Sequence, residues 1–454
     1  MIPRAALLAA AIGLAGCTMG PDYSRPSVAV PESYRNQTEP ASTASLGDEK
    51  WPQVFQDEEL QKLIRAALRQ NYDVRIAASR ILQARAEVGL ARSQQFPSVS
   101  GTAGYSLQKL PGFAFEFFQI VGGFSWDPDF WGKYRRATEG ARAALLASDW
   151  SRREVLLTVV SNVAMAYFQL RELDSELDIA QRTLASRRES LQLTETLSNG
   201  GRASLLDVRQ AEQLVETAAE TIPETERLIA QEEDLISTLM GENPHSIPRG
   251  RALIEQPLPA AVPAGLPSRL LERRPDILQA EQQLVTANAQ IGVARAAFFP
   301  DLPLTGSAGI QSVHLAGLFT GPSGAWNFSA PLTEPIFTAG RLRSNLKLVE
   351  AQRDQAVLNY QQTIQQAFRQ VSDALTSYTK FREFREHQQA LTTAAEGAAN
   401  LSEVRYKGGA ASYLEVLTNE TNYFSAELNL SRAQLNERLS LVQLYSALGG
   451  GWEQ

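Results

Sequence analysis

The feature that most constrains this 454-residue chain is a long internal repeat. The segment Ala91-Arg92 with Phe96-Pro97 recurs as Ala294-Arg295 with Phe299-Pro300, an offset of 203 residues between Pro97 and Pro300. Order and spacing hold across nearly the whole chain beyond the N-terminal segment. A duplicated unit of this length means that each half builds the same substructure, and we expect the two copies to lie around a common axis.

Composition narrows the function classes. The chain has 44% hydrophobic and 20% charged residues, as a folded protein does. Its formal net charge of −7, without a basic cluster, disfavours a nucleic-acid partner. The three histidines, His245, His314 and His387, are too far apart to form a metal-ligand motif. Neither Gly132-Lys133 nor Gly306-Ser307-Ala308-Gly309 completes a phosphate loop or a nucleophile elbow, so we expect no enzyme, no metal and no cofactor.

The N-terminus has the pattern of a lipoprotein signal peptide over residues 1–16. Arg4 precedes an apolar stretch that is too short to span a bilayer. The stretch ends in Leu14-Ala15-Gly16-Cys17, which is typical of a bacterial lipobox, and Cys17 is the only cysteine. We expect cleavage to leave Cys17 as the first residue, carrying covalent acyl chains. Thr18 then favours the outer membrane; the alternative is an exported protein with an unmodified thiol.

Two segments predict unusually long helices. Between residues 141 and 199 apolar residues recur every seven positions, with a second apolar stripe between them and no proline or glycine. Sustained heptads indicate coiled-coil packing, and at 1.5 Å per residue such a helix is about 90 Å long. The second copy, over 342–407, is interrupted only by Gly397. The heptad positions of the first copy are Leu156, Val163, Leu170, Leu177, Leu184 and Leu191, with Val159, Ala166, Leu173 and Ala180 between them.

Two other segments, about 98–126 and about 302–333, alternate apolar with small polar residues and have aromatic residues near their ends. Period-two alternation over about ten residues is typical of transmembrane β-strands. We therefore expect one β-hairpin in each repeat. The alternative is a pair of soluble hairpins packed on the body of the protein.

Closing these strands into a barrel requires more than one chain. Four strands cannot span a membrane by themselves, because open sheet edges cannot be left in lipid. Two chains would give eight strands around a bore filled by side chains, whereas three would give twelve and leave a lumen. We expect an α+β membrane protein in which a homotrimer closes a 12-stranded barrel. The long helices would continue it as a periplasmic α-helical, coiled-coil barrel with near-sixfold symmetry.

The predicted boundaries follow the repeat and the proline-rich segments. The turn between the long helix and the lower helix is predicted at about 199–204 in the first copy and about 407–412 in the second. After the signal peptide we expect a lipid-anchored arm over 17–60, repeat 1 over 61–241, a proline-rich equatorial linker over 242–270, repeat 2 over 271–448 and a tail over 449–454.

Four motifs together resemble the outer membrane factors, in the lipoprotein branch of the TolC-like family typified by OprM and NodT. They are Cys17-Thr18-Met19-Gly20-Pro21-Asp22-Tyr23, Trp51 to Leu60, Glu272-Arg273-Arg274-Pro275-Asp276-Ile277 and Tyr406-Lys407-Gly408-Gly409. The resemblance covers essentially the whole mature chain. It implies a trimeric exit duct in the outer membrane of a Gram-negative bacterium, extending into the periplasm. It also implies a periplasmic adaptor and an RND-type inner-membrane pump as partners, with the expulsion of toxic compounds as the function.

The two glycine turns are the predicted periplasmic tips, where glycine permits a tight reversal between antiparallel helices. Small residues beside the glycines leave a shallow groove, and the resemblance implies that such grooves receive the adaptor. The alternative is plain helix–turn–helix geometry, which needs glycine in any case. The predicted adaptor contacts are Gly200, Gly201, Arg202, Ala203, Ser204, Gly408, Gly409, Ala410, Ala411 and Ser412.

Just past the tips, Asp207 and Glu415 occupy equivalent positions of the two copies. Repeated by threefold symmetry, inward-facing acids would form a ring that constricts the pore. The resemblance implies a gate in this region, closed at rest and opened by the adaptor. Thr418 stands where many relatives carry an aspartate and Glu420 lies nearby, so all four residues are gate candidates. The alternative is that Asp207 and Glu415 are first-turn acids that stabilise helix N-termini.

The favoured function is therefore the exit duct of a tripartite efflux pump for drugs or other toxic small molecules or ions. The alternatives are the exit duct of a type I protein secretion system and a coiled-coil envelope scaffold without a channel. The sequence does not name the substrate, because the pump selects it upstream.

Overall fold

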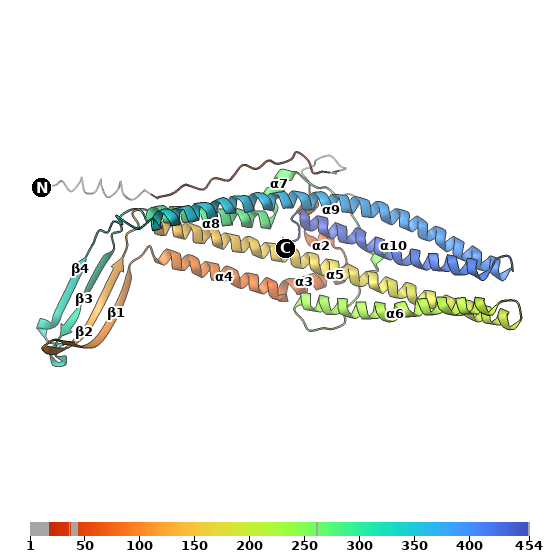
Figure 1. Cartoon of the computed structure of the whole chain (residues 1–454), viewed down its shortest axis with the longest axis horizontal. Helices are drawn as coiled ribbons and strands as arrows, with labels where there is room; N and C mark the ends of the chain where they lie inside the picture. The colour runs from red at the N-terminus through yellow and green to blue at the C-terminus, as the bar shows by residue number, and fades with distance from the viewer. Residues whose placement is uncertain (1–17, 36, 38–43, 260–261, 453–454) are drawn as a thin grey trace. The chain divides into compact units, whose positions relative to one another are not determined.

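The computed structural model describes residues 18–35, 37, 44–259 and 262–452 (Figure 1). The predicted signal peptide and Cys17 lie outside the described residues. The chain divides into two compact units. The first unit contains Met1–Val28, Ser79–Trp150 and Ile277–Thr363, and the second contains Ala29–Ala78, Ser151–Asp276 and Ile364–Gln454.

The first unit contains a four-stranded antiparallel sheet with the order β1-β2-β3-β4. Its strands are β1 (Ser98–Leu110), β2 (Phe113–Trp126), β3 (Leu304–Ser312) and β4 (Gly324–Ser329). Pro111 and Gly112 alone connect β1 to β2. The fixed φ of proline followed by the positive φ of Gly112, +101°, is the geometry of a type II turn. Within the described chain β1 and β4 each pair on one side only, which leaves both outer edges of the sheet open.

Helices make up most of the rest of the chain. The described helices are η1 (Leu46–Asp48), α2 (Trp51–Val54), α3 (Glu58–Gln70), α4 (Tyr72–Ser93), α5 (Lys133–Asn199), α6 (Leu205–Met240), η2 (Leu253–Glu255), α7 (Pro267–Arg273), α8 (Pro275–Ala296), η3 (Leu315–Gly317), η4 (Gly321–Ser323), α9 (Arg341–Lys407) and α10 (Tyr413–Ala447). Both α5 and α9 have 67 residues, and each is therefore about 100 Å long. In the described residues, no helix combines the length and the hydrophobicity that crossing a bilayer would require.

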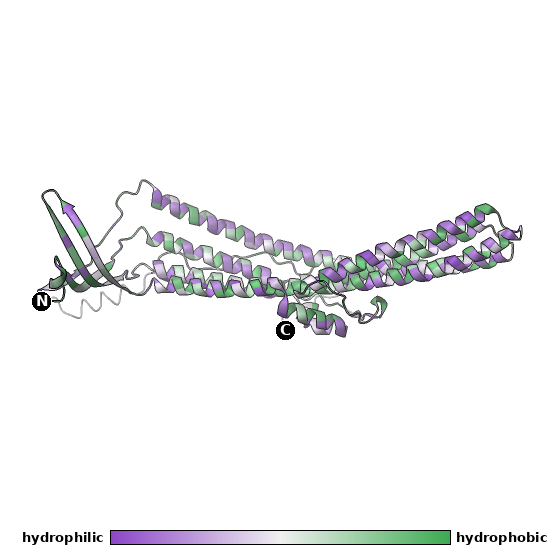
Figure 2. Cartoon of the chain, turned by 90° about the horizontal axis from the view of Figure 1, so that it is seen from below, coloured by the Kyte–Doolittle hydropathy of each residue, from purple (hydrophilic) through white to green (hydrophobic). Residues whose placement is uncertain are grey.

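The heptad pattern predicts the buried side of α5 well. Eight of its ten positions are buried in the structure, while Leu177 and Leu191 are half-buried. Figure 2 shows hydrophobic and hydrophilic residues alternating around the long helices, as this packing requires. In the second unit α6 lies beside α5 and α10 beside α9, so each long helix forms a hairpin with its successor (Figures 1 and 2).

The long helix α5 begins at Lys133, eight residues before the predicted start at 141. The prediction stopped at Gly140, which the structure places inside the helix. A Cβ atom at Gly140 would lie 3.5 Å from the Cβ of Ala289 in α8. That distance is an ordinary van der Waals contact, so this position packs against α8 within the first unit, and one glycine costs a long helix only about 1 kcal/mol.

The structure places short helices inside the segments predicted as arm and linker. In the arm over 17–60, η1, α2 and α3 begin at Leu46, Trp51 and Glu58, and Asp57 caps α3 by accepting from the Glu59 and Leu60 amides. In the linker over 242–270, α7 begins at Pro267, since proline is favoured in the first turn of a helix.

Candidate functional site

The two predicted tips are tight turns built on glycines with a positive φ. Gly201 has a φ of +71° and Gly409 a φ of +73°, values that other residues adopt only with strain. The Arg202 amide donates to the Leu197 carbonyl at 2.8 Å, and the Ala410 amide donates to the Arg405 carbonyl at 2.8 Å. These bonds satisfy the last carbonyls of α5 and α9. The glycines are thus required by the turn itself, which was the structural alternative to a contact site.

The two tips pack against each other within the second unit. Ala211 of α6 and Tyr413 and Val416 of α10 form one buried cluster. The Tyr406 ring meets the Tyr413 ring edge-on, with 5.2 Å between the centroids. This packing fixes the spacing of the two turns.

Large apolar side chains beside the turns remain exposed. Leu205 and Leu206 open α6 and are 66% and 64% exposed, and Leu414 at the start of α10 is 58% exposed. The sequence reasoning missed these leucines. The available signal was an apolar pair directly after the N-cap Ser204, where polar residues are usual. Exposed leucines at a turn are suited to contact with another protein.

The structure gives Asp207 and Glu415 local partners. Asp207 forms a capping box with Ser204: the Ser204 amide donates to its carboxylate at 2.9 Å, and its own amide donates to the Ser204 hydroxyl at 3.2 Å. The Glu415 carboxylate lies 3.5 Å from the Arg405 guanidinium. The Asp207 contact agrees with the helix-stabilising alternative, whereas the Glu415 contact joins the start of α10 to the end of α9. The acidic ring, which requires three chains, stays a prediction.

Thr418 and Glu420 differ from each other in their surroundings. Thr418 is exposed and its hydroxyl donates to the Leu414 carbonyl at 2.8 Å. Glu420 is half-buried, and burial raises the pKa of its carboxyl group while Arg187 of α5 lowers it. The Arg187 guanidinium lies 4.8 Å from the centre of the Phe424 ring and donates to the Leu214 carbonyl at 2.7 Å. In one chain Glu420 therefore belongs to the contact between α10 and α5.

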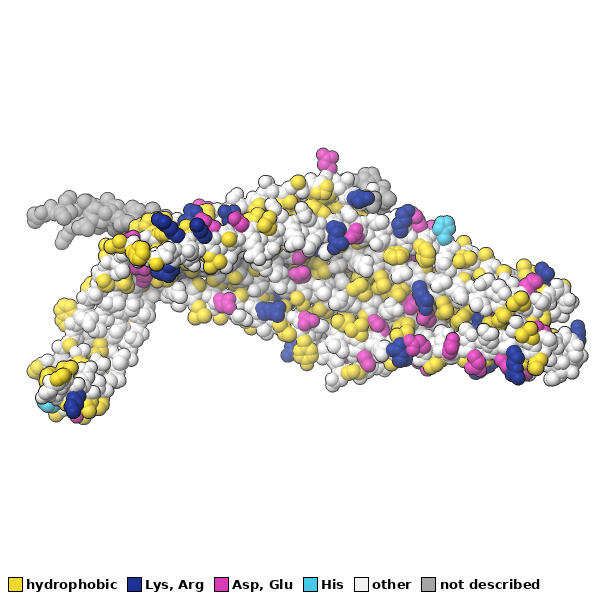
Figure 3. Space-filling model, in the orientation of Figure 1, with side chains coloured by type: hydrophobic (Ala, Val, Ile, Leu, Met, Phe, Trp, Pro, Cys, Tyr) yellow, Lys and Arg dark blue, Asp and Glu magenta, His cyan; other side chains and the backbone are white. Residues whose placement is uncertain are grey.

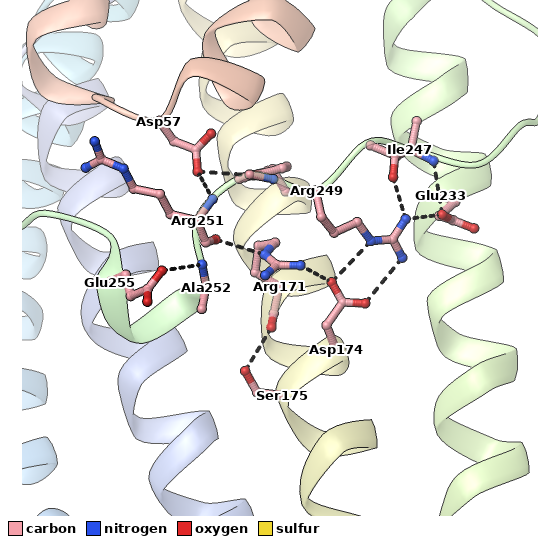
Figure 4. Close-up of polar contacts among 12 residues, drawn as sticks. Asp57, Arg171, Asp174, Ser175, Glu233, Ile247, Arg249, Arg251, Ala252 and Glu255 are labelled. Carbon is pink, nitrogen blue, oxygen red and sulfur yellow. Dashed lines mark hydrogen bonds and ion pairs between the residues drawn. The ribbon is translucent and has the colours of Figure 1, made fainter. Parts of the chain in front are cut away.

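The proline-rich linker is fastened by charged groups of the second unit (Figure 4). Arg249 donates to both oxygens of Asp174 in α5, at 3.2 and 3.3 Å, and also binds Glu233 in α6. The Arg171 Nε donates to the Arg251 carbonyl at 3.0 Å. The linker thereby holds α5 and α6 together near the base of their hairpin.

The segment that follows Cys17 is bound within the first unit. Arg136, near the start of α5, is buried and donates to the Met19 and Gly20 carbonyls at 3.1 and 3.4 Å. It also forms ion pairs with Asp22 and Glu139, both at 2.8 Å. The described N-terminus therefore lies against the first turn of α5. This helix begins seven residues after Trp126, the last residue of β2.

The sheet leaves apolar side chains uncovered. Val99 and Trp326 are each 81% exposed, and Tyr105, Leu107, Phe113, Ile120 and Phe328 are exposed as well. This disagrees with hairpins packed on the body of the protein. On the face that Figure 3 draws, hydrophobic, acidic and basic side chains are interspersed along the helices.

The comparisons with known proteins agree with this geometry. The family model described as outer membrane efflux protein matches residues 63–242 and 266–450. The chain is 37% identical to TtgC of Pseudomonas putida, a probable efflux pump outer membrane protein, over 97% of this chain and 93% of that one. It is 34% identical to the cation efflux system protein CusC of Escherichia coli, over 98% of both chains. Its structure resembles the open state of the Neisseria gonorrhoeae outer membrane channel MtrE, with a TM-score of 0.89 and 34% identity over 96% of this chain and 99% of that one.

Proposed function

This chain belongs to the outer membrane efflux protein family, and on that premise we propose that three copies of it form one exit duct. It acts in the outer membrane as an efflux channel. The observation that carries the trimer is the sheet, with open edges at β1 and β4 and exposed apolar side chains. In lipid every backbone polar group needs a partner, so each open edge must pair with another chain.

Three sheets give a 12-stranded barrel with room for a lumen. The helices α5 and α9, each about 100 Å long, continue the duct into the periplasm. At the far end of the helical hairpins, the turns at Gly201 and Gly409 and the exposed Leu205, Leu206 and Leu414 form the surface for a periplasmic adaptor. The adaptor connects the duct to an inner-membrane pump of RND type.

We further propose that Cys17 carries the lipid anchor. The lipobox supports this, and so does the binding of Met19, Gly20 and Asp22 by Arg136. An anchor there would lie beside the junction between β2 and α5, where the membrane surface is expected. Mass spectrometry of the N-terminal peptide tests this proposal, because acylation adds the mass of the fatty chains to Cys17.

Single-channel conductance of the purified chain in planar bilayers tests the duct itself. We expect discrete conductance steps, which a coiled-coil scaffold would not produce. Protein secretion is separated from efflux by deleting the gene and testing susceptibility to antibiotics, solvents and metal ions. Increased susceptibility without loss of a secreted protein supports efflux; the reverse result would support secretion.

A further inference from the structure

Two carboxyl groups of α5 are buried beside α10. Glu172 and Glu176 are four residues apart, so both lie on one face of the helix. Their exposed fractions are 2% and 6%, although acidic side chains are seldom buried to this extent. This face belongs to the heptad side of α5, between Leu170, Leu173 and Ala180.

Among the described residues, a single cation, Arg432, acts on these two acids. The Nε of Arg432 in α10 donates to Glu176 at 2.9 Å. Glu172 accepts a long bond from the Gln169 side chain at 3.3 Å, and its other oxygen has no hydrogen-bond partner in the described chain. The charged groups that act on Glu172 are Glu176 from its own helix and Arg432 from α10.

The charged residues of α5 next to Glu172 bind other groups. Arg171 and Asp174 bind each other and contact the linker at Arg251 and Arg249. The other ionic contacts between α5 and α10 lie farther along the helices: Arg182 binds Asp178 of its own helix at 2.9 Å and Glu427 of α10 at 3.6 Å, and Arg187 lies opposite Glu420. Arg182 and Asp178 are exposed, whereas Glu172 and Glu176 are both buried and have one cation between them.

When two carboxyl groups share a buried site, ionising both costs free energy, because the like charges repel each other and neither is solvated by water. Burial, followed by the charge of Glu176, raises the pKa of Glu172 to about 8. Glu172 therefore keeps its proton at neutral pH, and its neutral carboxyl group does not repel Glu176. When that proton is lost, the second negative charge faces the first without a further cation.

We propose that the proton on Glu172, buried beside Glu176, holds α5 against α10, and that its loss loosens the contact between the two helical hairpins. Since α5 turns into α6 and α9 turns into α10, this contact joins the hairpins that carry the two tips. The pair thereby makes the packing of the tips sensitive to pH. As regulation of the duct, this inference rests on the proposed function.

Proton linkage determines whether the contact between α5 and α10 becomes more or less stable as pH rises. An acid whose pKa is raised in the packed state binds more protons there than in the loosened state. The contact is therefore most stable at low pH and weakens as pH rises from the ordinary carboxyl range, about 4.5, through about 8.

Hydrogen exchange of the full-length protein in lipid nanodiscs tests the inference. Peptides covering residues 168–180 of α5 and 425–438 of α10 are compared at about pH 6 and about pH 9, after correction for the intrinsic exchange rate. For the wild type we expect protection of both peptides to fall at least about tenfold, the equivalent of one pKa unit. Glu172→Gln keeps a neutral side chain at both pH values and should keep its protection at the higher pH.

Asp178→Asn is the matched control, because Asp178 lies on α5 but is exposed and paired with Arg182. It should lose protection as the wild type does. Equal protection of the wild type at both pH values would overturn the proposal, and so would the same loss in Glu172→Gln. Because this measurement does not need a conducting pore, a failure of the duct proposal would show separately, as a lack of conductance in bilayers.

Discussion

At the scale of single residues, the structure depends on buried polar groups that join distant parts of the sequence. Asp57 is 1% exposed and accepts hydrogen bonds from the Tyr167 hydroxyl, the Arg251 amide and the Gln256 side chain at 3.2, 2.8 and 2.6 Å. It also caps α3. Burial opposes its ionisation, but these hydrogen bonds outweigh burial and lower its pKa. One carboxylate thus joins α3, α5 and the linker.

We predict that Asp57→Asn destabilises the protein strongly. The amide group turns an acceptor into a donor, which leaves at least one buried donor unpaired at a cost of about 1–3 kcal/mol. Thermal unfolding at neutral pH measures the loss. The exposed Asp178→Asn should change stability by less than about 0.5 kcal/mol.

The lowered pKa of Asp57 predicts that its contribution to stability depends on pH. Because the pKa of Asp57 is lowered in the folded state, its contribution is present above the ordinary carboxyl range and is lost as pH falls through the lowered value. The advantage of the wild type over Asp57→Asn should therefore shrink below about pH 4. An advantage that stays constant down to the acid unfolding transition would contradict this account.

Another prediction for a single residue concerns Glu415, one of the gate candidates. Removing the carboxylate in Glu415→Ala eliminates its ion pair with Arg405 and one charge of the predicted ring. We expect a several-fold rise in the open probability of single channels. Glu212→Ala serves as the control, since Glu212 pairs with the exposed Arg209 farther along α6. An unchanged open probability in Glu415→Ala would remove Glu415 from the gate.

At the scale of elements, the sequence predicts those whose pattern is local. The heptads predict the buried side of α5, and the period-two alternation predicts both hairpins. Local pattern misplaced the start of α5, because the helix continues through Gly140, which lies against Ala289 of α8. The second hairpin was expected to extend to about 333. Strand β4 ends at Ser329, two residues before Pro331, which cannot donate to a strand ladder, and antiparallel pairing resumes as a single bridge between Asp301 and Thr333.

The candidate site was predicted less completely than the fold. The tip turns could be located because glycine with a positive φ has a sequence signature. The pairing of Glu172 and Glu176 with Arg432 could not, because Arg432 is 256 residues from Glu176 along the chain. The exposure of Leu205 and Leu206 was also hidden, since apolar residues in a helix are usually expected in the core.

The exposed leucines at the start of α6, Leu205 and Leu206, lead to a prediction about adaptor binding. The double variant Leu205→Ser with Leu206→Ser should weaken docking of the adaptor, because burying a leucine contributes about 1.5–3 kcal/mol. Efflux-dependent resistance should fall while conductance in bilayers stays normal. Leu235→Ser, at a leucine of α6 that is 47% exposed and lies near the other end of the helix, should leave resistance unchanged.

At the scale of the whole molecule, the resemblance to outer membrane factors is confirmed by the family match and by relatives that span nearly the whole chain. Relatives of similar identity are named for different cargoes, such as toluene and cations. This agrees with a duct whose substrate is selected elsewhere. What one chain lacks is closure, because in the part of the chain that the structure describes the sheet ends in two open edges.

The mass of the intact complex tests the central proposal most directly. We predict that native mass spectrometry of the full-length protein, released from detergent, gives three times the mass of one processed chain. A complex of two chains, or a stable monomer with its sheet edges unpaired, would contradict the account.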